Sequence, residues 1–129
     1  ATLHRDRPIA YIIKKNNMGF IEKLNDVGVN YVEFEKDTMI YSGVYKVVEF
    51  NNNFKVYEKM KMQKVVTSIE YNNNKFSKGD ILISMNQKRS NLIAELLEPE
   101  APNSYVSFGI IKTSLNNQLP IYRIKNFNN

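Results

Sequence analysis

The sequence contains no cysteine and no tryptophan, and its only histidine is His4. The absence of cysteine excludes a disulfide framework, a thiolate zinc site and a cysteine nucleophile, but it does not identify the compartment. A zinc site needs at least three ligands, usually with two of them close in sequence. Because His4 has no second histidine and no carboxylate three residues later, we expect it to be a terminal residue rather than a ligand.

Glycine and long apolar runs are also scarce. None of the five glycines forms a Gly-x-Gly arrangement, which excludes a glycine-rich phosphate loop, and no Gly-x-Ser-x-Gly elbow of a serine hydrolase occurs. No apolar run approaches the ~18 residues of a membrane-spanning helix. The first residues, ATLHRDRPIAYII, lack the apolar stretch and cleavage site of a signal peptide. The location of the chain stays open.

What is present is enough apolar sequence for a folded domain. The chain has 129 residues, 43% of them apolar, so we expect one domain over residues 1–129 with a core of its own. The net charge of +5 raises the question of nucleic acid binding. The lysines nevertheless occur singly in alternating stretches such as KVYEKMKMQK, and no basic block or RNA-binding aromatic motif occurs. We therefore expect no nucleic acid partner.

The first third of the sequence changes from a strand pattern to a helix pattern. RPIAYII, residues 7–13, is a short apolar run that predicts a buried strand. Residues 16–28 then place Phe20, Leu24 and Val27 at helical spacing, with Ile21 beside them. Asn16 or Asn17 can cap this helix, and Gly28 can take the left-handed position after its end.

A long region of strand alternation follows. Residues 30–35 and 38–50 predict two strands, and Gly43 suggests a bulge or bend in the second. The asparagine triplets at 51–53 and 72–74 predict turns, because asparagine tolerates left-handed backbone conformations. Between them, residues 54–63 and 64–71 are expected to be neighbouring antiparallel strands.

The remaining third predicts a turn at Gly79 and Asp80, a central strand over ILISM (81–85) and a helix ending by Glu98. Pro99 stops that helix, and Ser90 or Asn91 can cap its start. Residues 102–109 and 119–124 predict two closing strands. The predicted fold class is α+β: a mainly antiparallel sheet, sandwich-like or an open barrel, with two short helices.

Carboxylates are the remaining route to catalysis, and the candidates are Glu95, Glu98 and Glu100. Glu95 and Glu98 lie three residues apart on one helix face, so an acid–base pair is geometrically possible. A structural role is favoured, because Glu98 can bond backbone N–H groups of the following loop and isolated helix glutamates are usually solvated. The eight tyrosines could form a stacking platform for a sugar or peptide, although strand tyrosines more often pack half-buried.

A cluster of polar residues, Asn86 to Arg89, joins the predicted central strand to the second helix. Its side chains can satisfy the ends of these elements or project into a partner surface.

The segment GDILISMNQKRSNLIAELLEPEAPNSYVSFG resembles the C-terminal region that follows the catalytic domain in a subset of bacterial carboxypeptidase-A-like zinc peptidases. The shared pattern is a Gly-Asp turn, an apolar strand, an Asn-Gln pair, an apolar helix ending in Leu-Leu-Glu-Pro, and a Ser-Tyr pair before an aromatic-Gly strand. It uses Gly79, Asp80, Asn86, Gln87, Leu96, Leu97, Glu98, Pro99, Ser104, Tyr105 and Gly109. Upstream, RPIAYII, Asp37-Thr38 and VYKVVEF extend the resemblance over nearly the whole chain.

The resemblance implies a non-catalytic C-terminal accessory domain that packs on a catalytic peptidase domain in the same chain or helps to position substrate. In such peptidases the zinc ligands, a His-x-x-Glu pair and a distant His, belong to the preceding domain, and none of them maps onto this sequence. The resemblance therefore implies no cofactor here, zinc in the parent protein, and an extracytoplasmic or periplasmic location for that parent. The expected interdomain contacts are Asn86, Gln87, Arg89, Glu98 and Tyr105. The alternative is an autonomous carbohydrate- or peptide-binding module that uses an aromatic face of the sheet.

Overall fold

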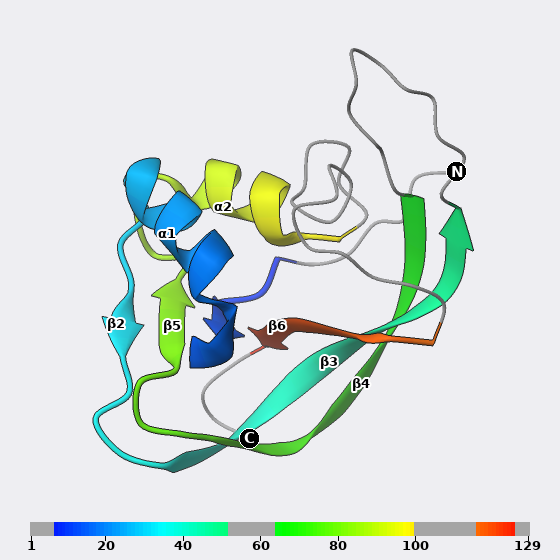
Figure 1. Cartoon of the computed structure of the whole chain (residues 1–129), viewed down its shortest axis with the longest axis horizontal. Coiled ribbons are helices and arrows are strands. Elements are labelled where there is room, and N and C mark those ends of the chain that lie inside the picture. Colours follow the sequence, from blue (N-terminus) through cyan, green and yellow to red (C-terminus); the bar gives the residue numbers. More distant parts are fainter. Residues whose placement is uncertain (1–6, 52–63, 100–115, 126–129) are drawn as a thin grey trace.

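The computed structural model describes residues 7–51, 64–99 and 116–125. Within these ranges the protein forms one six-stranded sheet and two α-helices (Figure 1). The strands are β1 (Ala10–Ile13), β2 (Val32–Glu33), β3 (Thr38–Asn51), β4 (Lys64–Phe76), β5 (Ile81–Ser84) and β6 (Gln118–Ile124). The helices are α1 (Met18–Asp26), which follows the 3-10 turn η1 (Lys15–Asn17), and α2 (Ser90–Leu97).

The sheet has the strand order β2-β5-β1-β6-β3-β4, and all of its strand pairs are antiparallel. Its two outer strands, β2 and β4, do not pair with each other among the described residues, so the sheet is not closed there. Both helices gather at the end of the sheet formed by β2, β5 and β1, while the long β3–β4 ribbon extends away from them (Figure 1). The predicted antiparallel α+β class is confirmed.

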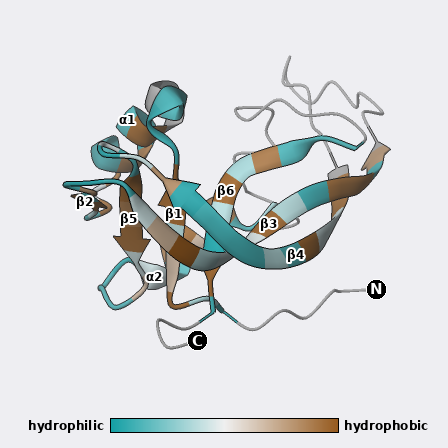
Figure 2. Cartoon of the chain, turned by 90° about the horizontal axis from the view of Figure 1, so that it is seen from below, coloured by the Kyte–Doolittle hydropathy of each residue, from teal (hydrophilic) through white to brown (hydrophobic). Residues whose placement is uncertain are grey.

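Strand β1 is buried on both faces because its alternate side chains enter two apolar clusters. Tyr11 and Ile13 join the cluster that also contains Leu24 of α1 and Ile93 and Leu97 of α2. On the other face, Ala10 and Ile12 pack with three further buried residues, Phe76, Tyr122 and Ile124. Figure 2 shows hydrophobic colouring on β1 and β5, at the end of the sheet where the two helices lie.

Several local predictions are confirmed. Residues 10–13 form a buried strand, and β5 lies between β1 and β2 with Ile81 and Ile83 buried. Gly28 (φ 82°) follows the end of α1, and Gly79 (φ 95°) lies in the turn before β5. Asn17 precedes α1 as predicted, but its side chain makes no capping bond there. Its amide donates instead to the carbonyl of Lys14.

Other predictions are wrong, and the reason is strand pairing over long distances. The triplet at residues 72–74 is not a turn but part of β4, where each asparagine pairs with a residue of β3. Gly43 itself pairs regularly with Tyr71 of β4, but the β3–β6 register shifts just after it, between Val44 and Lys46, and the β3–β4 register shifts between Val47 and Glu49. The strand expected over 30–35 is reduced to the two residues of β2.

The helix predictions also need correction. Arg89, not Ser90 or Asn91, occupies the position before α2, and no side chain caps the helix. Val27 of the predicted apolar stripe is 40% exposed because it follows the last residue of α1, whereas Ile21 and Leu24 are buried. The expected strands at 54–63 and 102–109 lie outside the described residues.

Candidate functional site

A polar cluster between the sheet and the end of α2 joins a carboxylate to two buried tyrosines. Glu98 follows the last residue of α2, while Tyr11 lies in β1 and Tyr45 in β3. The Tyr45 hydroxyl lies 3.0 and 2.9 Å from the two Glu98 carboxylate oxygens, and the Tyr11 hydroxyl donates a hydrogen bond to the same carboxylate. Both tyrosines are fully buried and Glu98 is partly buried. The three side chains therefore tie the end of α2 to the middle of the sheet.

Arg123 of β6 supplies a positive charge beside this cluster. It is the residue opposite Tyr11 in the β1–β6 pairing, and it is 4% exposed. Its guanidinium carbon lies 5.9 Å from the centre of the Tyr45 ring, within the range of a cation–π contact. A buried charge of this kind is tolerated because an opposite charge and polar groups lie nearby.

The environment keeps both tyrosine hydroxyls protonated. Burial, followed by the negative charge of Glu98, raises the pKa of Tyr11, and the positive charge of Arg123 offsets only part of this. Burial and the Glu98 charge likewise raise the pKa of Tyr45 well above its ordinary value. A tyrosine that acts as a base or nucleophile needs the opposite shift. The cluster is therefore suited to holding a carboxylate in place rather than to proton transfer near neutral pH.

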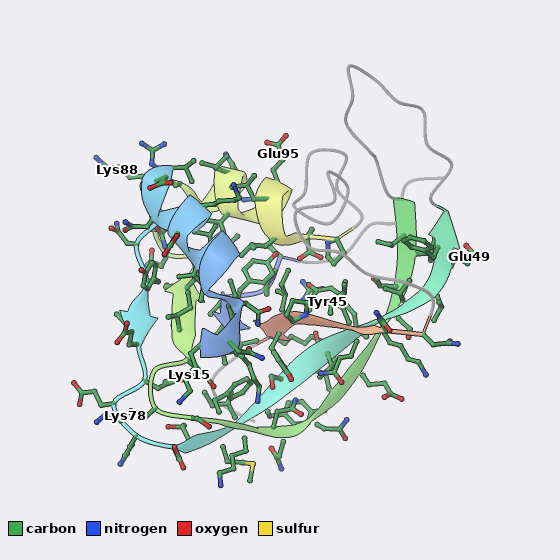
Figure 3. The ribbon with its side chains drawn as sticks, in the orientation of Figure 1. Lys15, Tyr45, Glu49, Lys78, Lys88 and Glu95 are labelled. Carbon is green, nitrogen blue, oxygen red and sulfur yellow. The ribbon has the colours of Figure 1, made fainter. Side chains whose placement is uncertain are left out.

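The structure does not bring the candidate carboxylates together as an acid–base pair. Glu98 turns toward the two tyrosines, whereas Glu95 is exposed and points away from the sheet on the outer side of α2 (Figure 3). Glu100 lies outside the described residues. Among the described residues, the Glu98 carboxylate accepts hydrogen bonds from the Tyr11 and Tyr45 hydroxyls. That it also binds backbone N–H groups of the following loop stays a prediction, because residues 100–115 lie outside the described ranges.

The polar cluster at residues 86–89 is used largely within the fold. The Gln87 amide accepts from the Asn30 backbone N–H (3.0 Å) and donates to the Asn30 carbonyl (2.9 Å) and the Ser84 carbonyl (2.7 Å). It thereby joins the segment before β2 to the end of β5. Arg89 lies against Gly28, since a Cβ atom on that glycine would be 2.9 Å from the Arg89 Nε.

Asn86 and Tyr105 are the other two residues that are predicted from the sequence to contact an adjoining domain. Asn86 is exposed, and Tyr105 lies outside the described residues. That an adjoining domain binds to this set of residues stays a prediction.

Asp80 has the structural role expected for the turn. Its carboxylate is buried and accepts from the backbone N–H groups of Lys15 (2.9 Å) and Ser77 (2.8 Å). One side chain thus closes the turn before β5 and anchors η1 after β1. The contact with Lys15 could not be predicted from the sequence, because 65 residues separate the two.

The described aromatic side chains do not provide a platform of several exposed rings. Tyr41 and Tyr71 stack with ring centres 5.7 Å apart, but Tyr41 is 42% exposed and Tyr71 only partly so. Phe76 packs edge-on against Tyr122 in the second core cluster, under the ammonium group of Lys14. In the described part of the chain, the Tyr41–Tyr71 pair is thus the one partly exposed aromatic pair that supports a stacking platform for a sugar or peptide.

No group of three or more His, Cys, Asp or Glu side chains in the described ranges has the arrangement of a metal site. Neither described helix has the length and apolar character needed to cross a membrane.

Comparison with known proteins points to one class of protein. Carboxypeptidase 2 of Trichophyton equinum is 33% identical over 130 aligned positions, which cover 97% of this chain but 23% of that protein. Carboxypeptidase 2 of Trichophyton tonsurans is 32% identical with the same coverage, and that of Trichophyton rubrum is 33% identical over 95% of this chain and 23% of its own length. No protein-family profile and no solved structure matches significantly.

The chain thus spans about a quarter of the length of the curated relatives it matches. The resemblance to a carboxypeptidase region is supported by these relatives. Because they are fungal, the bacterial origin expected from the sequence has no support.

Proposed function

We propose that this chain is a non-catalytic accessory region of a zinc-carboxypeptidase-like protein, which packs on the catalytic part or helps to position its substrate. The observation that carries the proposal is the unequal coverage: the similarity takes in 97% of this chain and 23% of Carboxypeptidase 2. A region that corresponds to a quarter of an enzyme, and is matched almost end to end, is the size of one structural unit within it.

The chemistry of the described residues supports a structural role. The Glu98 carboxylate is committed to Tyr11 and Tyr45, and the pKa of each hydroxyl is raised, away from the value that a catalytic base requires. Glu95, the possible partner carboxylate, is exposed. The proposal therefore assigns the peptide chemistry to the rest of the parent protein.

The proposal also assigns the zinc to that other part. A carboxypeptidase zinc needs a set of His and carboxylate ligands around an open coordination position. The donor set of the described residues does not fit such a centre, since it contains no cluster of three or more His, Cys, Asp or Glu side chains. This part of the proposal agrees with the absence of a His-x-x-Glu motif from the sequence.

Metal content and hydrolysis by the 129-residue chain test the non-catalytic part. The purified chain is incubated with zinc, dialysed, analysed for bound metal and assayed for release of C-terminal residues from unblocked peptides. We expect substoichiometric zinc and no release. Stoichiometric zinc together with hydrolysis that a chelator abolishes would contradict the proposal.

Deletion in a relative tests the accessory part. Carboxypeptidase 2 of Trichophyton equinum is compared with a form that lacks the segment matched by this chain. If the segment packs on the catalytic part, its removal lowers the thermal midpoint and the activity of the remainder. Unchanged midpoint and unchanged activity would show that the segment has no such role.

A further inference from the structure

An exposed apolar surface lies on the β3–β4 ribbon, away from the helices. It consists of Met39, Tyr41 and Tyr71, and we call it the ribbon surface. Met39 is 63% exposed, Tyr41 is 42% exposed, and Tyr71 is partly exposed. Positions 39 and 41 lie two residues apart in β3, and Tyr71 is opposite position 43, so the pleat directs all three side chains to one face.

The ribbon surface is not a part of the core that happens to reach solvent. β6 pairs with β3 only from Gly43 onward, so Met39 and Tyr41 lie beyond the end of that neighbouring strand. Among the described residues, none of these three side chains is a member of either buried cluster. The exposed part of this apolar area therefore lies outside the described core.

Gly43 holds the tyrosine pair in a fixed arrangement. A Cβ atom at Gly43 would lie 3.0 Å from the Tyr71 ring and 2.7 Å from the Ile69 side chain, so the Tyr71 ring occupies the space that glycine leaves open. From there it stacks on Tyr41, with 20° between the ring planes. Rigid, exposed tyrosines are good binding anchors because little side-chain entropy is lost when a partner covers them.

We propose that the ribbon surface is where this region contacts the remaining part of a carboxypeptidase-like chain. The inference rests on the proposed function. The rest of the chain is the expected partner, because in the fungal carboxypeptidase relatives the matched segment is joined to a further three quarters of the polypeptide. Gln87 and Glu98 are less suited to this contact, because their side chains already form hydrogen bonds within the fold.

The ribbon surface also indicates the chemistry of the area that covers it. Methionine and tyrosine are enriched in the centres of protein interfaces, where they meet other apolar side chains. Exposed Lys75 is directly opposite Met39 in the ribbon and places a positive charge beside the apolar area. The matching area is apolar with a carboxylate at its border.

Site-specific cross-linking tests the contact. In Carboxypeptidase 2 of Trichophyton equinum, this chain replaces the segment that it matches, and a photoreactive amino acid replaces Tyr41. After irradiation, cross-linked peptides are identified by mass spectrometry. We expect cross-links from position 41 to the part that was not replaced. The control is the same group at Val32, which is 61% exposed and lies in β2, at the other edge of the sheet.

A yield at position 41 several times that at position 32 supports the proposal, and an equal or lower yield overturns it. Placing the photoreactive group at the position aligned with Tyr41 in the unaltered fungal protein makes the test independent of whether the chimera folds. Failure of the ribbon surface is distinguishable from failure of the accessory role. If only the ribbon surface is wrong, cross-links to the rest of the protein form from other positions of this region. If the accessory role is wrong, the deletion leaves the thermal midpoint and the activity of the remaining protein unchanged.

A surface variant provides a second measurement. Met39→Gln should change the thermal midpoint of the isolated chain by less than about 2 °C, because the side chain is mostly in solvent. In the chimera the same change should speed proteolysis between the two parts, while Val32→Gln should not. Equal proteolysis of the two chimeric variants would contradict the contact.

Discussion

The hydroxyl of Tyr45 lies within hydrogen-bond distance of both carboxylate oxygens of Glu98, although 53 residues separate the two in sequence. Tyr11 donates to the same carboxylate from a third element. Hydrogen bonds to a charged group contribute more than those between neutral groups, especially where water is excluded. The contact makes the last turn of α2 dependent on β1 and β3, and this dependence can be measured.

Tyr45→Phe removes one donor and leaves the ring in place. We expect the free energy of unfolding to fall by about 1–2 kcal/mol, because the partly buried Glu98 carboxylate loses a hydrogen bond without gaining water in its place. Urea unfolding followed by circular dichroism measures the change. Tyr41→Phe is the matched control, since that tyrosine is 42% exposed, and it should cost less than about 0.5 kcal/mol. Equal losses for the two variants would show that the Glu98 contact is not stabilising.

The raised pKa values of Tyr11 and Tyr45 predict a loss of stability in alkali. In the unfolded chain a tyrosine ionises near its ordinary pKa of 10.0, whereas the folded chain keeps these two protonated. Above that pH the unfolded state binds fewer protons than the folded state, so stability is complete below the unfolded value and decreases as the pH rises past it. Urea midpoints between about pH 8 and 11.5 should show this decrease. The double variant Tyr11→Phe/Tyr45→Phe should show a shallower decrease, and an unchanged slope would contradict the assignment.

Gly43→Ala should destabilise the protein by about 1–3 kcal/mol, because the added methyl group has to displace Ile69 or the Tyr71 ring. The control is Gly19→Ala in α1, where a Cβ atom meets no other atom within 4 Å. That change should leave stability the same or raise it by up to about 1 kcal/mol, since alanine favours a helix over glycine. Thermal melting distinguishes the two, and a stable Gly43→Ala variant would mean that the ribbon can open at this point.

Gln87→Ala removes all three bonds between this side chain and the backbone at Asn30 and Ser84. We expect a loss of about 1–2 kcal/mol. Hydrogen exchange at Asn30 should accelerate more than exchange in β1, because the effect is local. Asn86→Ala, one residue away at an exposed side chain, should leave both measurements unchanged. If the two variants exchanged at the same rate at Asn30, the Gln87 bridge would have no role in holding that segment.

The sequence predicted the elements whose signals are local. The apolar run at 10–13, the glycine after α1 and the turn at Gly79 and Asp80 each follow from the conformational preferences of a few adjacent residues. The turn predicted at the asparagines 72–74 does not form, because their turn preference is weaker than the regular pairing that β3 offers them. The irregularity at Val47 and Glu49 has no local signal of its own.

The cluster around Glu98 was only partly accessible to sequence reasoning. A glutamate before a proline at a helix end marked the position, and a tyrosine within AYII marked a polar atom in a buried strand. What joins them is the strand order, which places β1 and β3 on either side of β6. Because that order comes from long-range pairing, no spacing in the sequence reveals that Tyr11 and Tyr45 meet one carboxylate.

The central position of β6 has a consequence for how the chain folds. The β3–β4 ribbon joins neighbours in sequence and can form early, but β1 pairs only with β5 and β6, which come much later along the chain. During synthesis β1 can pair with β5 first, but its second edge stays unpaired until β6, which begins at residue 118, has left the ribosome. A ribosome stalled before β6 would carry a nascent chain in which the β1 and β3 edges that flank β6 are both unpaired, and unpaired edges of this kind favour aggregation.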